Sequence, residues 1–187
     1  MSFVLKCKKL FFLKFGEFYN YISAKKYMKS YIKYLKQLGI NINGTPNYIS
    51  SSVQFDSHFY NYITINNGTV ISKEVMFLTH DYSIARGIEA VFGKSWDEKK
   101  TPHFVRKIEI GENCFIGARS VILPGTTIGN NCIIGAGSVV RGHIEDNSIV
   151  VGNPAIVVSK TTDWTKRHIE KGDIVNNVKE DRDTDIS

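Results

Sequence analysis

Aliphatic residues recur at every sixth position through the middle of the chain. From Ile110 onward, the step of six meets only β-branched aliphatic residues, in the series Ile110, Ile116, Ile122, Ile128, Ile134 and Val140. The fifth residue of these hexads is mostly small, as in Cys114, Ser120, Thr126, Cys132 and Ser138. A helix repeats near 3.6 residues and a half-buried strand near two, so neither explains this period.

Each hexad is interpreted as a short strand followed by a corner. The aliphatic residue points into a narrow core, the next residue is Gly or small and lets the backbone turn, and the fifth fits a tapering interior. Coils built in this way stack so that each covers its neighbours. The expected fold class is therefore an all-β solenoid.

A weaker series with the same step lies upstream and runs Val53, Phe59, Ile65, Ile71 and Phe77. The separation of Phe77 from Ile110 is not a multiple of six, so the register breaks between them. Residues 83–107 are therefore expected to form an inserted loop. For this first series, a generic β-rich domain with coincidental spacing stays open as the alternative.

The segments around the repeats predict helices. Ala24–Leu38 carries apolar residues at spacings of three and four, and Gly39 fits the position that ends a helix. This helix is expected to cap the open end of the solenoid. A second, short helix is predicted over 162–171, and residues 176–187 are polar enough to be disordered.

The expected organisation is therefore a basic helical segment at 1–46, a repeat domain at 47–160 and a tail at 161–187.

Charge is concentrated at the N-terminus. The net charge is +6, and residues 1–38 alone hold nine Lys against one Glu. No basic stripe interleaved with aromatic residues follows, which argues against nucleic-acid binding. Lysines interrupt every apolar run of the first 18 residues, so we expect neither a signal peptide nor a membrane span. The expected location is therefore the cytoplasm. The aromatic, basic N-terminus predicts a helical cover on the repeat domain; contact with an anionic membrane surface is the alternative.

The three cysteines do not suggest a disulfide framework, because the count is odd and no two are close in sequence. Cys114 and Cys132 occupy equivalent hexad positions one full coil apart, so they should stack inside the solenoid. Parallel side chains in a reducing compartment favour two buried free thiols.

With these residues in view, the chain resembles the hexapeptide-repeat acyltransferases, most of all bacterial enzymes that O-acetylate or N-acylate surface-polysaccharide sugars. The resemblance covers about residues 25–160, and its carriers besides the hexads are residues 71–81, 116–125 and 151–155. It implies a left-handed parallel β-helix of triangular section, assembled as a homotrimer. It also implies active sites between neighbouring subunits, with acetyl-coenzyme A as acyl donor along the groove.

His80 is the candidate catalytic residue. It is the fourth residue of the Phe77 hexad, so it should face outward at a corner, where an imidazole can take a proton from an acceptor hydroxyl near neutral pH. Asp81 either orients His80 or holds the acceptor; a solvent-exposed loop carboxylate is the alternative. Tyr82, Arg86 and Trp96 are candidates for an acceptor pocket, with packing of the loop as the alternative interpretation.

For the acyl donor, the resemblance implies backbone contacts at two Gly-Ala steps. It also implies that the chain leaves the last coil near the adenine, at residues 152–155. Relatives often carry a basic residue soon after the proline of that exit, which this sequence lacks, so Arg141 or Lys160 is expected to serve the phosphates. The candidate donor-binding residues are Gly117, Ala118, Gly135, Ala136, Arg141, Asn153, Pro154 and Lys160. No metal is implied.

Two other functions compete. A γ-type carbonic anhydrase needs three converging histidines, and the five here are scattered: His58, His80, His103, His143 and His168. A non-catalytic solenoid scaffold has no need of the His80-Asp81 pair or of the insertion that follows it. Among acceptors, a sugar is favoured by the resemblance, and an antibiotic or serine stays open.

Overall fold

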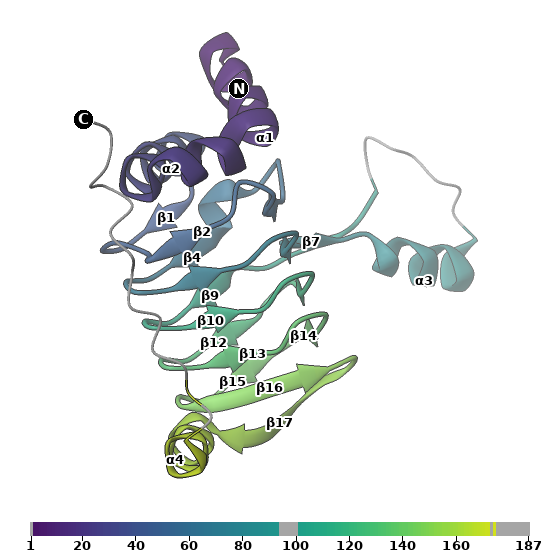
Figure 1. The fold of residues 1–187 in the computed structure, drawn as a ribbon. Coiled ribbons are helices and arrows are strands. Elements are labelled where there is room, and N and C mark those ends of the chain that lie inside the picture. Colours follow the sequence, from purple (N-terminus) through teal and green to yellow (C-terminus); the bar gives the residue numbers. More distant parts are fainter. Residues whose placement is uncertain (1, 94–100, 173, 175–187) are drawn as a thin grey trace.

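The computed structural model describes residues 2–93, 101–172 and 174. Within them three sheets, whose strands are parallel except for the last strand of the second sheet, form the faces of a prism (Figure 1). Strands that follow one another in the chain fall in successive sheets. The first sheet contains β1 (Asn41–Ile42), β4 (Ile63–Ile65), β9 (Ile108–Ile110), β12 (Thr127–Ile128) and β15 (His143–Ile144). The second contains β2 (Tyr48–Ile49), β5 (Val70–Ile71), β10 (Phe115–Ile116), β13 (Ile133–Ile134), β16 (Ser148–Gly152) and β17 (Ala155–Lys160). The third contains β3 (Gln54–Phe55), β6 (Met76–Phe77), β11 (Val121–Ile122) and β14 (Val139–Val140).

The core is a set of columns of aliphatic side chains, one column inside each sheet. In the second sheet, for example, Ile71 pairs with Ile116, and Ile116 pairs with Ile134. All six aliphatic residues of the second series, from Ile110 to Val140, are at most 1% exposed. The six-residue period and its inward positions are thus confirmed for this series.

The predicted register of the upstream series is wrong in the first coil. Ile49 pairs with Ile71 and Phe55 pairs with Phe77, so these residues, and not Val53 and Phe59, continue the inward columns. Residues 56–62 form an irregular step that includes the 3₁₀ turn η1 (Tyr60–Tyr62). From Ile65 onward the six-residue step is confirmed: Ile65 and Phe77 are fully buried, as the step predicts.

The corners of the coils contain a recurring position whose backbone is left-handed. The fourth residue of several hexads has a positive φ, and asparagine tolerates that conformation well. Asn113, Asn131 and Asn147 share one corner, where Asn113 Nδ2 donates to Asn131 Oδ1 at 3.0 Å and Asn131 Nδ2 donates to Asn147 Oδ1 at 3.1 Å. The chain therefore turns at this fourth position rather than at the Gly that follows the aliphatic residue.

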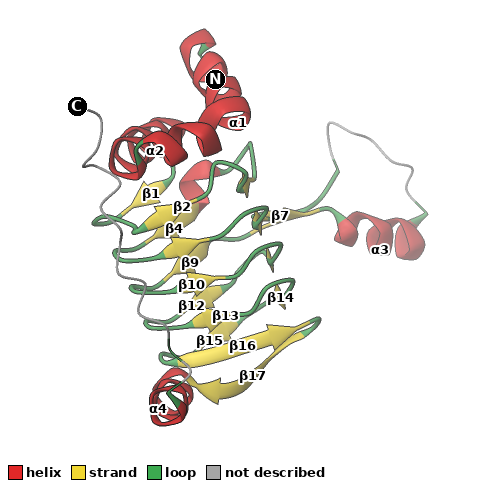
Figure 2. Cartoon of the chain, viewed as in Figure 1, coloured by secondary structure: helices red, strands yellow, loops and turns green. Residues whose placement is uncertain are grey.

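Two helices cover the end of the prism at the first coil (Figure 2). Helix α1 spans Phe3–Ile22, and α2 spans Ala24–Leu38 as predicted, ending at Gly39 with left-handed backbone. Phe12 of α1 packs against Tyr31 and Tyr34 of α2, with ring centroids 4.8 and 5.1 Å apart. The first strand, β1, already begins at Asn41, inside the segment 1–46 assigned to the N-terminal helices.

The insertion and the C-terminus add structure outside the prism. The predicted loop contains α3 (Ser83–Phe92) and β8 (Phe104–Val105), and β7 (His80–Asp81) comes just before it. Strand β7 pairs antiparallel with β8, and α3 projects away from the coils (Figure 1). After β16 the chain reverses into β17, and α4 (Thr161–Lys171) matches the predicted short helix. Residues 176–187 lie outside the described residues. Within the described part, no helix combines the length and apolar content of a membrane span.

Candidate functional site

A carboxylate and an imidazole meet where the first two coils leave the third sheet. Because β3 pairs with β6, Asp56 at the end of the first coil lies beside Thr79 and His80 at the end of the second. Asp56 Oδ2 is hydrogen-bonded to Nδ1 of His80, and it also accepts from the Thr79 amide at 3.0 Å and the Thr79 hydroxyl at 2.7 Å. The Asp56 side chain is 3% exposed and that of His80 is 26% exposed, so the imidazole forms the accessible side of the pair.

The electrostatics of this pair fix which nitrogen of His80 is free. Burial by itself raises the pKa of Asp56, but the hydrogen bonds from Thr79 and His80 outweigh it and hold that pKa below its usual value. Asp56 is therefore ionised at neutral pH and accepts the Nδ1–H of His80. The other ring nitrogen, Nε2, is left as a proton acceptor.

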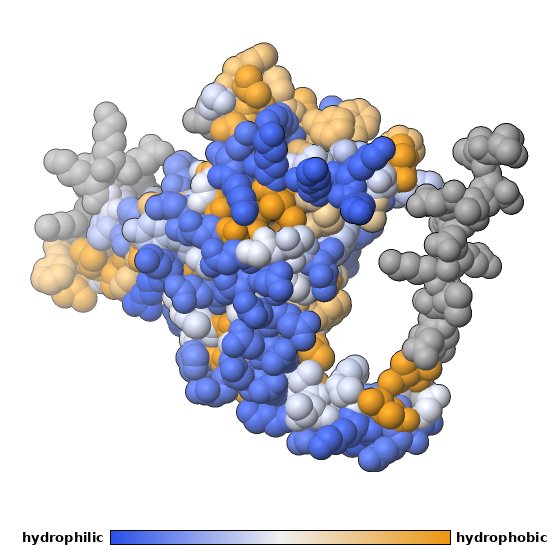
Figure 3. All heavy atoms as spheres, turned by 90° about the vertical axis from the view of Figure 1, so that its left-hand side faces the viewer, coloured by the Kyte–Doolittle hydropathy of each residue, from blue (hydrophilic) through white to orange (hydrophobic). Residues whose placement is uncertain are grey.

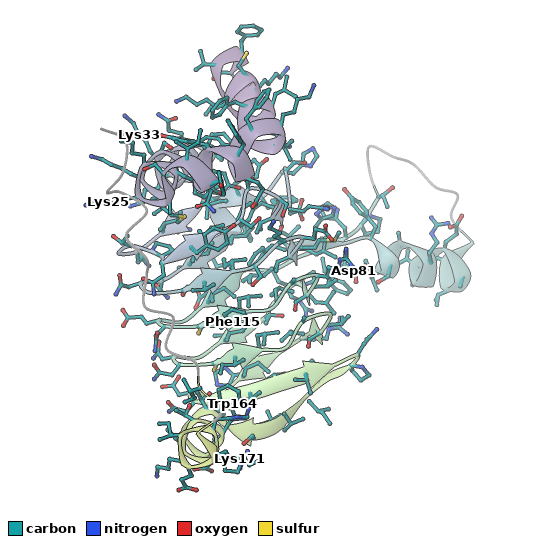
Figure 4. The ribbon with its side chains drawn as sticks, viewed as in Figure 1. Lys25, Lys33, Asp81, Phe115, Trp164 and Lys171 are labelled. Carbon is teal, nitrogen blue, oxygen red and sulfur yellow. The ribbon has the colours of Figure 1, made fainter. Side chains whose placement is uncertain are left out.

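Asp81, predicted as one candidate to orient His80, does not occupy that position. Its carboxylate accepts from the backbone N–H of Ser83 at 2.8 Å, where β7 gives way to α3 (Figure 4). The hydrogen bonds with Ser83 lower the pKa of Asp81. The orienting group of the imidazole is Asp56, which the sequence did not suggest.

Aromatic rings surround the accessible imidazole. The centroids of Phe59, Tyr82 and His103 lie 5.8, 5.3 and 6.4 Å from that of His80, and Tyr82 and His103 are 4.6 Å apart. Tyr82 was a predicted pocket residue. Phe59 and His103 were missed, since Phe59 was assigned to the core and His103 reaches the site only because β8 pairs back onto β7.

The remaining predicted acceptor residues are not gathered around His80. Arg86 lies on α3 and is ion-paired with Glu89 of the same helix. Trp96 lies outside the described residues.

A small pocket adjoins this site on the same corner of the prism. Its volume is about 180 Å³, and it is lined by Asp81, Phe104, Arg106, Pro124 and Arg141. The guanidinium of Arg106 lies over the Phe104 ring, 5.0 Å from its centroid. Arg141, predicted to hold coenzyme phosphates, thus lies on the His80 side together with a second arginine that the sequence did not single out.

The two predicted Gly-Ala steps stack on each other at a different corner. Gly117 N donates to Ile134 O and Gly137 N donates to Ala118 O, both at 2.8 Å. A Cβ on Gly117 would lie 2.5 Å from Ala136 N, so close approach between coils explains this glycine. This corner joins the second sheet to the third, whereas His80 follows the third sheet, so one face of the prism separates the two sites within a chain.

The other predicted donor-binding residues lie at the last coil. Asn153 and Pro154 form the turn between β16 and β17, next to the Gly152–Ala155 pair. Lys160 lies at the far end of β17, paired with Ser148. All three residues are exposed.

The placement of histidine, cysteine and carboxylate side chains bears on metal binding. Among the described residues, no three of them are grouped so that they could hold a metal ion.

Known proteins match this chain in sequence and in fold. The family model for bacterial transferase hexapeptide (six repeats) matches residues 107–142. Protein CapG of Staphylococcus aureus is 38% identical over 140 residues, which cover 74% of this chain and 76% of that protein. WbbJ of Escherichia coli K12, a putative lipopolysaccharide biosynthesis O-acetyl transferase, is 29% identical over 109 residues, or 56% of this chain and 53% of WbbJ. The chain thus spans about half the length of this second relative.

A solved structure shares the fold. The galactoside acetyltransferase in complex with coenzyme A superposes with a TM-score of 0.55 over 89% of this chain and 86% of that one. The sequence identity is 24%, so this likeness concerns the fold alone.

Proposed function

The chain belongs to the hexapeptide-repeat acyltransferase family, and from this premise we propose that it transfers an acetyl group from acetyl-coenzyme A to a sugar hydroxyl, with His80 as general base. The observation that carries the proposal is the pairing of a buried carboxylate with an accessible imidazole at the start of the insertion. A positioned carboxylate keeps the proton on Nδ1, and Nε2 is then ready to accept the proton of a hydroxyl.

The chemistry follows from this arrangement. His80 Nε2 takes the proton of the acceptor hydroxyl as its oxygen forms a bond to the thioester carbonyl carbon. The C–S bond then breaks, and the imidazolium returns the proton to the leaving thiolate, so the products are an O-acetyl ester and free coenzyme A. No protein nucleophile is required, because the thioester is already activated. Asp56 stabilises the transient imidazolium through Nδ1.

We assign the donor site to a neighbouring copy of the chain. The Gly117 corner and His80 are separated by a face of the prism, so a groove that uses both needs a second subunit. The proposed assembly is a homotrimer of left-handed β-helices, with a mass of about three times 21.1 kDa. Sedimentation equilibrium tests it, and a stable, active monomer would contradict the shared site.

A saccharide hydroxyl is proposed as the acceptor. Support comes from WbbJ, whose name describes an O-acetyl transferase of lipopolysaccharide biosynthesis. The pocket beside Asp81 is lined by Arg106 and Arg141, and we propose that these arginines donate to acceptor oxygens. An amine in place of the hydroxyl would react by the same route.

The decisive experiment measures thiol release from acetyl-coenzyme A in the presence of sugars, an aminoglycoside antibiotic or serine. We expect turnover with a saccharide, and a loss of about 10²–10⁴-fold in kcat for His80→Ala. The matched control is His168→Ala, since His168 lies on α4, which follows the last coil. A His80→Ala protein of native mass and circular dichroism that keeps wild-type turnover would remove the proposed base.

A further inference from the structure

The outer face of α1 is mostly apolar, with Lys14 among its aromatic side chains. It is formed by Phe3, Phe11, Phe15, Phe18, Tyr21 and Ile22, whose spacings of three, four and eight place them on one side of the helix. These side chains are 45% to 80% exposed. Figure 3 shows hydrophobic atoms gathered at the end of the molecule that carries α1.

Only the opposite face of α1 is buried against the rest of the chain. Phe12 and Gly16 are the buried residues of the helix. Phe12 packs on the α2 tyrosines, and Gly16 lies so close to Ser51 that an added Cβ would be 2.4 Å from the Ser51 Cβ. A large aromatic side chain has a surface on the order of 200 Å², of which roughly half or more is exposed at each of these positions. The outer face therefore forms a patch of several hundred Å², a size that marks an interaction surface.

The charge around this patch favours an anionic partner. Nine lysines and one acidic residue lie in residues 1–38. That acidic residue, Glu17, is turned toward the first coils, where it accepts from Ser50 Oγ at 2.7 Å and lies 3.2 Å from Lys73 Nζ. Lys25 and Lys33 point outward from α2 at the same end of the molecule (Figure 4).

A second copy of the chain fits this surface poorly. Docking two outer faces would bring two lysine-rich segments together without acidic residues of their own to offset the repulsion. An anionic lipid bilayer satisfies both features, since its headgroups attract the lysines and its acyl boundary accepts the aromatic rings.

We propose that α1 lies along the surface of an anionic lipid bilayer, with its outer face inserted among the acyl chains. A helix of 20 residues is about 30 Å long. It lies on the membrane rather than across it, because no described helix has the character of a membrane span. Asp56 and His80 belong to the first two coils, next to α1 and α2, so the docked surface and the candidate site share one end of the molecule.

The test is flotation of the full-length chain with vesicles, and it does not depend on acetyl transfer. We expect binding to equimolar phosphatidylcholine and phosphatidylglycerol, weaker binding to phosphatidylcholine alone, and release at high salt. The triple variant Phe11→Ser, Phe15→Ser, Phe18→Ser should bind at least about tenfold more weakly, because each lost ring removes buried apolar area. The matched control is Ile156→Ser with Val158→Ser, two comparably exposed apolar residues on β17.

A charge variant covers the case in which the triple variant misfolds. Lys25→Glu with Lys33→Glu leaves α1 unchanged and should weaken the preference for anionic vesicles. The proposal is overturned if the wild-type chain fails to float with anionic vesicles, or if folded variants float as well as the wild type. It is also overturned if the triple variant lowers the oligomer mass and leaves vesicle binding unchanged, which would identify a second copy as the partner.

Discussion

The carboxylate of Asp56 is hydrogen-bonded to Nδ1 of His80 across 24 residues of sequence. One coil stacked on the next creates this contact, since β3 and β6 are neighbours in the third sheet. Two bonds from Thr79 hold the carboxylate in place. The orientation of the imidazole therefore depends on the fold of the first coil, and Asp56 acts as a positioning residue for the proposed base.

Asp56→Asn should reduce kcat by about 10²-fold or more. An amide that donates to Nδ1 moves the imidazole proton to Nε2, the nitrogen that must accept from the acceptor hydroxyl. KM for acetyl-coenzyme A should change little, because Asp56 lies away from the proposed donor corner. Steady-state kinetics check both values, and Asp56→Glu should restore part of kcat. A parallel loss of thermal stability and kcat in both variants would instead indicate a purely structural role.

Asp56 should also make the stability of the fold depend on pH in the acidic range. Its folded-state pKa is lowered, so the ionised form stabilises the fold above the unfolded value of about 3.9, and this contribution is lost as the pH falls through the folded pKa. The difference in urea midpoint between the wild type and Asp56→Asn should shrink below about pH 4. A difference that grows on acidification would contradict the assigned direction.

The repeat made much of the fold predictable. Few residue types suit a position that points into the narrow interior of the prism, so Ile116, Ile122 and Ile134 follow the six-residue period and are fully buried. The helix over 24–38 could be predicted equally well, because its apolar spacing and the terminal Gly39 are local signals. In the coils and in this helix, the residues that form the pattern in the sequence are the same residues whose packing or backbone conformation forms the element.

The partner of His80 could not be found in this way. Asp56 follows Phe55 and begins the irregular step of residues 56–62, and in this first coil the six-residue register gives the wrong inward residues. His103 reaches the site through a β7–β8 pairing of two residues each, too short to leave a pattern in sequence. Contacts between distant segments with no repeat to align them need the three-dimensional structure.

The cysteines should respond to alkylation in two groups. Cys114 and Cys132 are 2% and 0% exposed, and their thiols donate to backbone carbonyls of the next coil, whereas Cys7 is exposed. The neighbouring Cys132 thiol and burial raise the pKa of Cys114, whereas the neighbouring Cys114 lowers the pKa of Cys132, so burial is what keeps both thiols from reacting. Thiol titration of the folded chain should label one cysteine quickly, and denaturation should release two more. Fast labelling of Cys114 or Cys132 in the folded Cys7→Ser variant would contradict the register of this coil.

Gly117→Ala should destabilise the coils strongly. The added Cβ would lie 2.5 Å from Ala136 N and 2.7 Å from Ile134 O, and backbone atoms of the next coil cannot move aside without breaking the Gly117–Ile134 hydrogen bond. The expected cost is about 1–3 kcal/mol or more in the free energy of unfolding, measured by urea denaturation. Gly87→Ala is the matched control: Gly87 lies in α3, and a Cβ added there would meet no atom within 4 Å, so alanine should be neutral or stabilise the helix by up to about 1 kcal/mol. If Gly117→Ala unfolds at the wild-type midpoint, the coils at the proposed donor corner are spaced more widely than these distances require, and close packing does not explain this glycine.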